Sequence, residues 1–326
     1  MIVDSSSAST PAMVELQEDP LNGRVQWERT NTQRALDELF STARKYRGTK
    51  EFKELLDFTV KFRSYAPFNA MLTHVQMPGA VFVAPAHRWL SEYGRRVTVA
   101  ARPLVILQPM GPVMFVFDVS DTEPIQDASQ LPVPVIAPFE TRGANPGQVL
   151  ALTIANAVRD GVRTSERQEG SQSAGSIRVA PPGSSMSYTV RVRPEIETEQ
   201  VPVRFEMLSN AKQQGSERYA TIVHELAHLY CGHLGTPSEK WWPNRRHLSD
   251  DEMEFEAESI SYLVCQRLGI ETRAAQYLET FIGQNADVPD ISLDLVMKVA
   301  GLIEQMGRER MPLRKEPLAA KKVTAR

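Results

Sequence analysis

The chain has 326 residues, of which 42% are hydrophobic and 24% charged, and its net charge is only -3. Its two cysteines, Cys231 and Cys265, are too few for a disulfide framework, and its apolar runs are too short to span a bilayer. We expect both thiols to be reduced and buried, with metal ligation as the alternative. The composition predicts a globular protein with room for two domains and no membrane segment.

The N-terminal segment, residues 1–23, lacks the basic start and the apolar core of a signal peptide. We expect a disordered tail there and a cytoplasmic location for the protein. A front domain is predicted over residues 24–123, beginning with helices at 27–46, 51–64 and 68–76. Short strands are expected around residue 81 and at 97–99, 104–107 and 113–117.

Basic and aromatic residues are concentrated in this front domain. Between Arg24 and Met110 the chain carries 14 lysines and arginines against 7 acidic residues, a local charge of +7. The aromatic residues Tyr65, Phe68, Phe82, Trp89 and Tyr93 are interleaved with Arg63, Arg88, Arg95 and Arg96. Rings that stack on bases, beside guanidinium groups that follow phosphates, suit single-stranded DNA. Burial of the same rings in a core would give a similar pattern.

The proline-rich segment 124–147 predicts a linker, and a second domain is predicted over residues 148–307. It begins with a helix at 148–163 and a flexible segment at 168–176. A hairpin is expected next, with Ile177 and Val179 in one strand and Tyr188, Val190 and Val192 in the other, followed by a strand at 203–207. Helices at 273–283 and 290–307 end the domain, and a basic tail at 308–326 is expected to be disordered.

The segment "YATIVHELAHLY" combines an apolar helical repeat with a metal-binding pattern. His224 and His228 are four residues apart, so on a helix both imidazoles project from one face, one turn apart. Glu225 can reach a metal-bound water as general base, which is the physical logic of HExxH in zinc peptidases. The pattern predicts a Zn²⁺ site with two histidine ligands and Glu225 as the catalytic residue.

A catalytic zinc takes three protein ligands plus water, so one more ligand is needed. His233 is one residue short of the position that a third histidine ligand occupies in the metzincins. A helix expected at 250–270 offers Glu254 and Glu258 on one face, with Glu256 directed elsewhere. We predict that Glu254 ligates the zinc while Glu258 holds a histidine N–H, and the reverse assignment is the alternative.

Two stretches of the sequence resemble a known family. The first is "SYAPFNAMLTHVQMPGAVFVAPAHRWLSEYGRRVTVAARPLVILQP", ending in "FVFDVSDTE"; the second holds "HELAH", Glu254, Glu258 and "AAQYLETFI". Both resemble ArdC-type antirestriction proteins, and the second also resembles the ImmA/IrrE-like metallopeptidases. The resemblance implies an α+β fold of two domains, a small helical and β domain that binds single-stranded DNA and a zincin-like metallopeptidase domain, encoded on a mobile genetic element. With the pattern of rings and arginines it nominates these DNA contacts: Tyr65, Asn69, Gln76, Arg88, Trp89, Arg95 and Arg96.

The sequence departs from this family in three places. The region from about residue 124 to residue 215 is longer and more hairpin-like than the family implies. Residues 98–105 replace a loop that is rich in lysine and glycine, and Trp241, Trp242 and His247 have no family role. His247 is either an oxyanion donor or a surface residue.

We expect an ssDNA-binding zinc metallopeptidase in which Glu225 activates water for attack on a peptide carbonyl. Its protein or peptide substrate, which the sequence does not name, is expected to pair with the strand at 203–207. One alternative is a DNA-shielding antirestriction factor whose zinc domain is structural or inactive. Another is a regulatory protease that cleaves a repressor.

Overall fold

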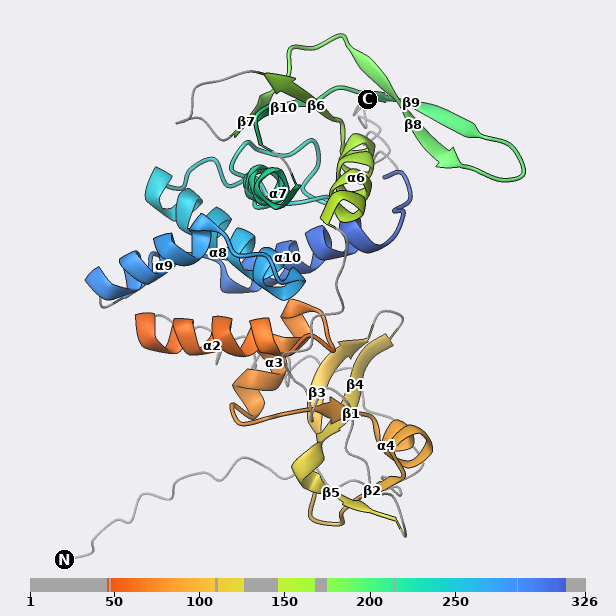
Figure 1. Ribbon diagram of the computed structural model, residues 1–326, viewed down its shortest axis with the longest axis vertical. Coiled ribbons are helices and arrows are strands. Elements are labelled where there is room, and N and C mark those ends of the chain that lie inside the picture. Colours follow the sequence, from red (N-terminus) through yellow and green to blue (C-terminus); the bar gives the residue numbers. More distant parts are fainter. Residues whose placement is uncertain are drawn as a thin grey trace, which may run out of the picture. The chain divides into compact units, whose positions relative to one another are not determined.

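The computed structural model describes residue 46 and residues 48–108, 111–125, 146–167, 175–213, 215–285 and 287–314. The protein is a mixed α+β structure (Figure 1). Its contacts divide the chain into a first unit, residues 1–37 and 80–132, and a second unit, residues 38–79 and 133–326. The predicted tail at 1–23, the predicted helix before residue 46, residues 126–145 of the linker, the segment 168–174 and residues 315–326 lie outside the described residues.

The described part of the first unit, residues 80–125, builds short strands around one helix (Figure 1). Strand β1 (Val83–Ala84) pairs antiparallel with β4 (Gly111–Asp118), which pairs antiparallel with β3 (Leu104–Gln108). Helix α4 (Ala86–Tyr93) ends at Gly94, whose left-handed φ of 59° turns the chain into β2 (Arg95–Val97). After the short 3-10 helix η2 (Val119–Asp121), β5 (Thr122–Pro124) pairs with β2. The strands predicted at 104–107 and 113–117 are confirmed as β3 and β4.

Trp89 forms the centre of the first unit's core. Its side chain is fully buried, and its indole Nε1 donates to the backbone oxygen of Phe117 at 2.9 Å. The ring packs edge-on against Phe82, with centroids 5.5 Å apart. The buried Asp118 carboxylate accepts hydrogen bonds from the backbone N–H groups of Val81 and Phe82, which ties the start of this unit to the end of β4.

The second unit begins with two helices that the sequence assigned to the front domain. Helices α2 (Thr49–Lys61) and α3 (Pro67–Gln76) pack on α8 (Asp250–Leu268), α9 (Arg273–Gln284) and α10 (Leu293–Arg308). Phe52 of α2 meets Phe255 of α8 with ring centroids 5.4 Å apart. Arg267 of α8 donates to the carbonyl oxygens of residues 59, 62 and 65 and pairs with Glu304 of α10. Residues 48–79 therefore fold with the second unit, because their apolar faces are buried there.

A three-stranded sheet forms the second layer of this unit. Helix α6 (Pro146–Ala157) and the 3-10 helix η3 (Val158–Asp160) lead into it, so the predicted helix at 148–163 ends early. In the sheet, β10 (Phe205–Asn210) runs parallel to β6 (Val162–Arg167) on one side and antiparallel to β7 (Gly175–Val179) on the other. Helix α7 (Gly215–Tyr230) packs against β7 and β10 and against α8 (Figure 1). The predicted pairing of a substrate with residues 203–207 is wrong, because β10 has a strand on each side.

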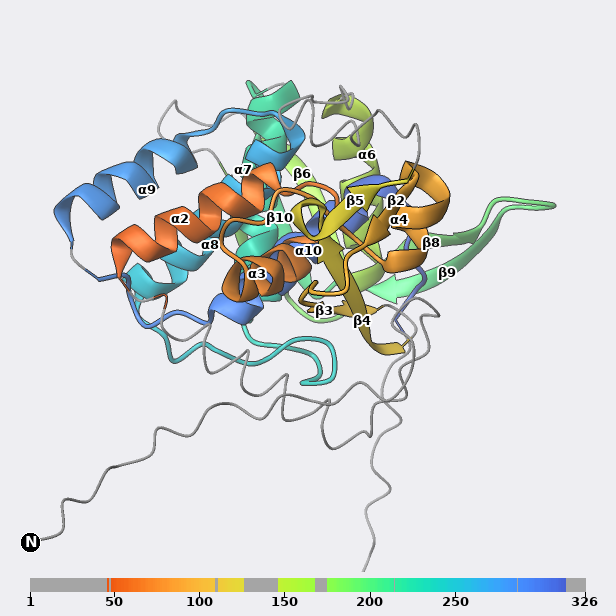
Figure 2. The ribbon, with the colours of Figure 1, turned by 90° about the horizontal axis from the view of Figure 1, so that it is seen from below.

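The predicted hairpin between residues 177–179 and 188–192 is also wrong. Strand β7 pairs with β10, whereas β8 (Ser185–Arg191) pairs with β9 (Glu197–Pro202) in a separate two-stranded ribbon (Figure 2). Pro181 and Pro182 lack the N–H groups that would continue a ladder, so the chain leaves the sheet after β7. The sequence of β9, "ETEQVP", is mostly polar and gives little strand signal.

Among the described residues, no helix is both long enough and apolar enough to cross a membrane.

Candidate metal centre

Helix α7 carries the motif and presents its two histidines together. Its buried face consists of apolar side chains such as Ile222, Val223 and Leu226, which pack into the unit and leave one polar stripe. On that stripe the Nε2 atoms of His224 and His228 lie 3.1 Å apart. The predicted one-turn spacing is therefore present, and both rings direct the same nitrogen to one point.

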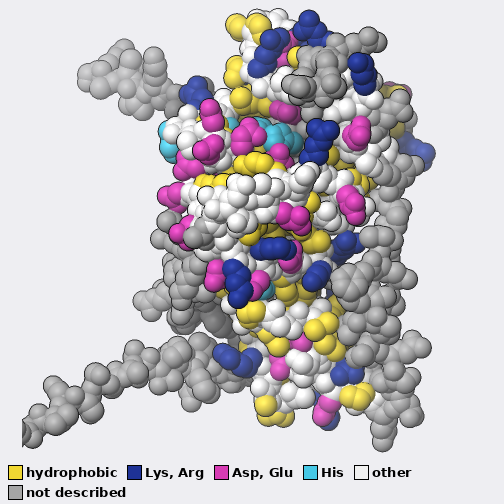
Figure 3. Space-filling model, turned by 60° about the vertical axis from the view of Figure 1, so that its left-hand side comes forward, with side chains coloured by type: hydrophobic (Ala, Val, Ile, Leu, Met, Phe, Trp, Pro, Cys, Tyr) yellow, Lys and Arg dark blue, Asp and Glu magenta, His cyan; other side chains and the backbone are white. Residues whose placement is uncertain are grey.

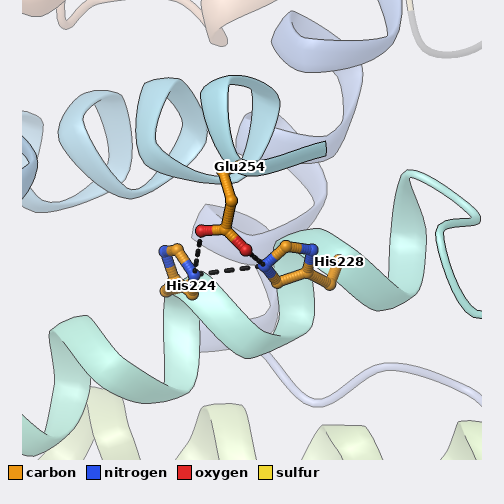
Figure 4. Close-up of side chains that lie close together, drawn as sticks. All are labelled: His224, His228 and Glu254. Carbon is orange, nitrogen blue, oxygen red and sulfur yellow. Dashed lines mark hydrogen bonds and ion pairs between the residues drawn. The ribbon is translucent and has the colours of Figure 1, made fainter. Parts of the chain in front are cut away.

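Helix α8 supplies the third group (Figure 4). A capping box between Ser249 and Glu252 fixes the start of the helix, which sets where the next turn points. In that turn the Glu254 carboxylate lies between the histidines, with Oε2 3.5 Å from His224 Nε2 and Oε1 3.4 Å from His228 Nε2. The three side chains of two helices thus converge on one space.

The spacing of these atoms fits zinc. A tetrahedral zinc with ligand bonds of about 2.0–2.1 Å holds its ligand atoms about 3.3 Å from one another. The two Nε2 atoms lie 3.1 Å apart, and the two oxygens of Glu254 lie 3.4 and 3.5 Å from one histidine each. Two imidazoles and one carboxylate are also the donor types of a catalytic zinc site. The residues present therefore fit the metal that the motif implies, and zinc ligation by them stays a prediction.

Glu258 occupies a different position from Glu254. Its Oε1 lies 3.7 Å from Nδ1 of His224, the ring nitrogen that faces away from the cluster. This distance is too long for a hydrogen bond but places a charge behind the ring. Glu254 therefore faces the two Nε2 atoms, whereas Glu258 lies behind His224 beyond hydrogen-bond distance. The predicted roles of Glu254 as ligand and Glu258 as holder of a histidine N–H stay predictions.

The three side chains of the cluster shift one another's protonation. The adjacent imidazoles of His224 and His228 hold the pKa of Glu254 far below its usual value. Burial, with the charges of neighbouring histidines, lowers the pKa of His228. Burial also opposes protonation of His224, but its hydrogen bond with Glu254 and the nearby carboxylates outweigh burial and raise its pKa. An ionised carboxylate beside a neutral imidazole is the protonation state that a metal requires.

Glu225, the predicted general base, is buried beside the sheet. Burial raises the pKa of Glu225 to about 7, although the charge of His224 and a hydrogen bond from the backbone N–H of Ile177 oppose that rise. Ile177 belongs to β7, the strand at the edge of the sheet beside α7. Glu225 is thus a carboxyl group able to exchange a proton near neutral pH.

A pocket of about 750 Å³ opens beside the motif. Its walls include His224, Glu225 and Glu258, together with Asn210 and Arg273. The side chains of the cluster reach solvent, at 20% exposure for His224, 14% for His228 and 51% for Glu254. Figure 3 shows histidine side chains at the surface, bordered by acidic ones. A ligand can therefore reach this site from outside.

A second group of possible ligands, Cys231, His233 and Glu256, lies buried behind the first. Glu256 already accepts two hydrogen bonds from Arg245, at 2.6 and 2.7 Å. Burial, and then the charge of Glu256, raise the pKa of the Cys231 thiol well above its usual value. A saturated carboxylate and a neutral thiol do not suit a metal. Both cysteines are free and buried, as predicted, and Cys265 is not among the grouped ligands of the described residues.

The sequence does not predict that His233, Glu256 and Arg245 are joined by hydrogen bonds. The sequence pattern indicates His233 only as a possible metal ligand and does not single out Arg245. The sequence predicts that Glu256 is directed away from the face of Glu254 and Glu258, and its side chain is buried in the interior. His247, Trp241 and Trp242 lie in the same connection between α7 and α8. His247 is exposed, whereas Trp242 is buried and donates its indole N–H to the backbone oxygen of Gly235.

Four of the predicted DNA contacts, Arg88, Trp89, Arg95 and Arg96, lie in the first unit. Trp89 as a stacking platform is corrected to a core residue, because a fully buried ring has no face to offer a base. Arg95 donates to Thr122, Arg96 pairs with Glu123, and Arg88 pairs with Glu92. Residues 80–125 hold four arginines and four acidic residues, so the charge excess of the front sequence lies before residue 80.

The other three predicted contacts belong to the second unit. Tyr65, Asn69 and Gln76 are half-buried. The Tyr65 ring stacks beside Phe62, and the Gln76 side chain donates to the backbone oxygen of Leu72 within α3. The nominated residues are therefore divided between the two units, and their role in DNA binding stays a prediction.

No protein-family model matches this chain, and no curated protein matches it. Among solved structures, it is similar to the metal-free crystal structure of the antirestriction ArdC protein from plasmid R388, at 14% identity. ArdC is also the family that the sequence resembles. The match covers 74% of this chain and 82% of that chain with a TM-score of 0.29, which is too low to argue for a shared fold or activity.

Proposed function

We propose that this protein is a zinc-dependent metallopeptidase of the ArdC type, with a zincin-like catalytic domain, and that the N-terminal part of its chain, up to residue 123, binds single-stranded DNA. The observation that carries the proposal is the convergence of His224, His228 and Glu254 beside a pocket, with the two Nε2 atoms 3.1 Å apart and each of them 3.4 to 3.5 Å from one oxygen of the carboxylate. The antirestriction role comes from the sequence resemblance.

Zinc held by these donors would supply a Lewis acid that activates water and polarises a peptide carbonyl. Glu225 on the pocket wall would take the proton that water loses on attack and pass it to the leaving amine. A pKa of about 7 suits both directions of this transfer at neutral pH. The carboxylate of Glu258, 3.7 Å behind the Nδ1 atom of His224, would help to hold that ring in place.

The test is Glu225→Gln in the full-length protein, with peptide hydrolysis, zinc content and thermal unfolding measured on the same preparations. Wild type should cleave a peptide library, and the variant should keep zinc and fold while losing about 10²–10⁴-fold in rate, the usual worth of a general base. Glu217→Gln on the first turn of α7 is a matched control, since this carboxylate lines the pocket farther from the histidines along the helix. Equal activity of wild type and Glu225→Gln would contradict the mechanism.

The DNA-shielding alternative is favoured by one observation. Glu225 is only 8% exposed and accepts a hydrogen bond from the backbone of β7, so its carboxylate is already engaged. A shielding factor would need the zinc domain only as a stable fold. If Glu225→Gln keeps full protection of DNA against restriction while wild type cleaves no peptide, this alternative replaces the peptidase.

A further inference from the structure

A continuous chain of hydrogen bonds runs from His228 into the interior, on the side of the ring away from Glu254. His228 Nδ1 lies 2.9 Å from His233 Nδ1, and His233 Nε2 lies 3.0 Å from Oε2 of Glu256. The same Glu256 accepts from both Nη atoms of Arg245 and from the backbone N–H of Ser292 at 2.8 Å. The side chains of His233 and Glu256 are 2% and 0% exposed, so this part of the hydrogen-bond chain is shielded from bulk solvent.

Between Glu256 and Nδ1 of His228, the hydrogen bonds have one direction in which every contact joins a donor to an acceptor. Glu256 accepts three hydrogen bonds from groups that can only donate, so it is an acceptor-only carboxylate, and His233 must donate to it from Nε2. A neutral imidazole that donates from Nε2 accepts at Nδ1. His228 must then donate from its own Nδ1, which leaves Nε2 without a proton.

A doubly protonated His233 could donate from Nδ1 to His228 and so reverse the hydrogen bond between the two rings. It would, however, place a second cation beside the buried Glu256 carboxylate, which Arg245 already neutralises. The desolvation cost of an extra buried charge opposes that state. The neutral chain needs no additional charge. The hydrogen bonds from Glu256 through a neutral His233 therefore place the hydrogen of His228 on Nδ1.

We propose that Arg245, Glu256 and His233 are positioning residues that hold His228 as the Nδ1–H tautomer, so that its Nε2 lone pair faces a divalent cation between α7 and α8. The inference rests on the proposed metal site, since it assigns a role to groups behind one of its ligands. His228 Nε2 is the atom that lies 3.4 Å from Glu254 and 3.1 Å from His224 Nε2. The chain thus prepares the site before any metal arrives.

The end of α7 is built to bring His233 back to His228. The N–H of His233 donates to the oxygen of His228 at 3.0 Å and the N–H of Gly232 donates to Leu229, the pair of bonds that defines a Schellman motif. Gly232 has φ of +80°, and a Cβ there would lie 1.9 Å from the backbone oxygen of Pro243. The N–H of Arg245 donates to the oxygen of Gly232 at 2.9 Å, so the same turn also anchors the arginine.

The direct test is the tautomer of His228 in the metal-free, full-length protein. Selective ¹⁵N-histidine labelling leaves six imidazoles to assign, and their nitrogen shifts report which ring atom is protonated. The proposal expects His228 as Nδ1–H in wild type. A proton on Nε2 of His228 in the metal-free protein would overturn it.

The second readout is zinc affinity measured by chelator competition. His233→Ala should bind zinc about 10–100-fold more weakly, the usual effect of removing a group that orients a metal ligand. In this variant Glu256 stays paired with Arg245, so no buried charge is left without a partner. Glu256→Gln is a second variant if His233→Ala does not fold. His247→Ala, at an exposed histidine, is the matched control and should bind zinc as wild type does.

The outcomes separate this inference from the proposed function. Unchanged zinc affinity in His233→Ala would overturn the inference and leave the zinc site intact. A wild-type protein that shows the Nδ1–H tautomer of His228 but binds no zinc would support the tautomer assignment and overturn the proposed function.

Discussion

Replacement of Trp89 by alanine tests whether this ring stabilises the first unit or contacts DNA. Removing a buried aromatic side chain costs about 3–5 kcal/mol. The lost indole donor also leaves the buried backbone oxygen of Phe117 without its partner, which adds about 1 kcal/mol. The sum, about 4–6 kcal/mol, is close to the whole stability of a small domain, so Trp89→Ala should unfold the first unit.

The assay is urea unfolding of the full-length protein, followed by hydrogen exchange of amides in β3 and β4. Leu90→Ala is the matched control, because Leu90 is the next residue of α4 and is 58% exposed. Its effect should stay within about 0.5 kcal/mol. If Trp89→Ala keeps wild-type exchange protection and loses only affinity for single-stranded DNA, the ring is a stacking platform and its assignment to the core is refuted.

Three further predictions concern pH, a buried ion pair and DNA binding. Burial lowers the pKa of His74 in the folded protein, so the unfolded chain binds a proton at this residue more readily. The free energy of unfolding should therefore fall as pH drops below about 6.5 and level off below the folded pKa. His74→Phe should flatten this decline, measured by urea unfolding between about pH 5 and 8. Arg267→Ala leaves the buried Glu304 without its main partner and should cost about 3–5 kcal/mol by thermal unfolding, whereas a loss below about 1 kcal/mol would contradict the anchoring role of this arginine. Arg95→Ala with Arg96→Ala should weaken binding of single-stranded DNA and flatten its salt dependence, and an unchanged salt slope would remove these two residues from the DNA contact.

Local spacing explains why the meeting of His224 and His228 could be predicted. His224, Glu225 and His228 lie within five residues of one helix, and helical geometry alone decides that the two imidazoles meet. The choice between Glu254 and Glu258 needed the crossing of α7 and α8, which sequence spacing does not give. Both acids share a face of α8, but only the first reaches the two Nε2 atoms.

Features that depend on distant contacts were not predictable in the same way. His233, Arg245 and Glu256 are separated along the chain, and their polar chain forms only after the connection between α7 and α8 folds over the helix end. The assignment of α2 likewise depends on a tertiary choice, because an amphipathic helix shows that one face is buried but not against which partner. The same limit applies to Trp89, since interleaved rings and arginines occur in cores as well as on binding surfaces.

The strands show where local signals fail. Strands β3 and β4 have enough apolar residues to be recognised, whereas β9 is a mostly polar strand held by pairing with β8. The hairpin was assigned to the wrong partners because β-propensity marks segments and not their pairing. Two prolines after β7 were the signal that could have corrected this assignment.

The central claim is that one zinc is held by His224, His228 and Glu254, and the most direct test is zinc content measured side by side in wild type, Glu254→Gln and Glu258→Gln. Wild type should carry about one zinc per chain. Glu254→Gln should lose most of it, because a ligand that faces both histidines is neutralised, while Glu258→Gln should keep more. Full occupancy in Glu254→Gln, or a greater loss in Glu258→Gln, would contradict this assignment.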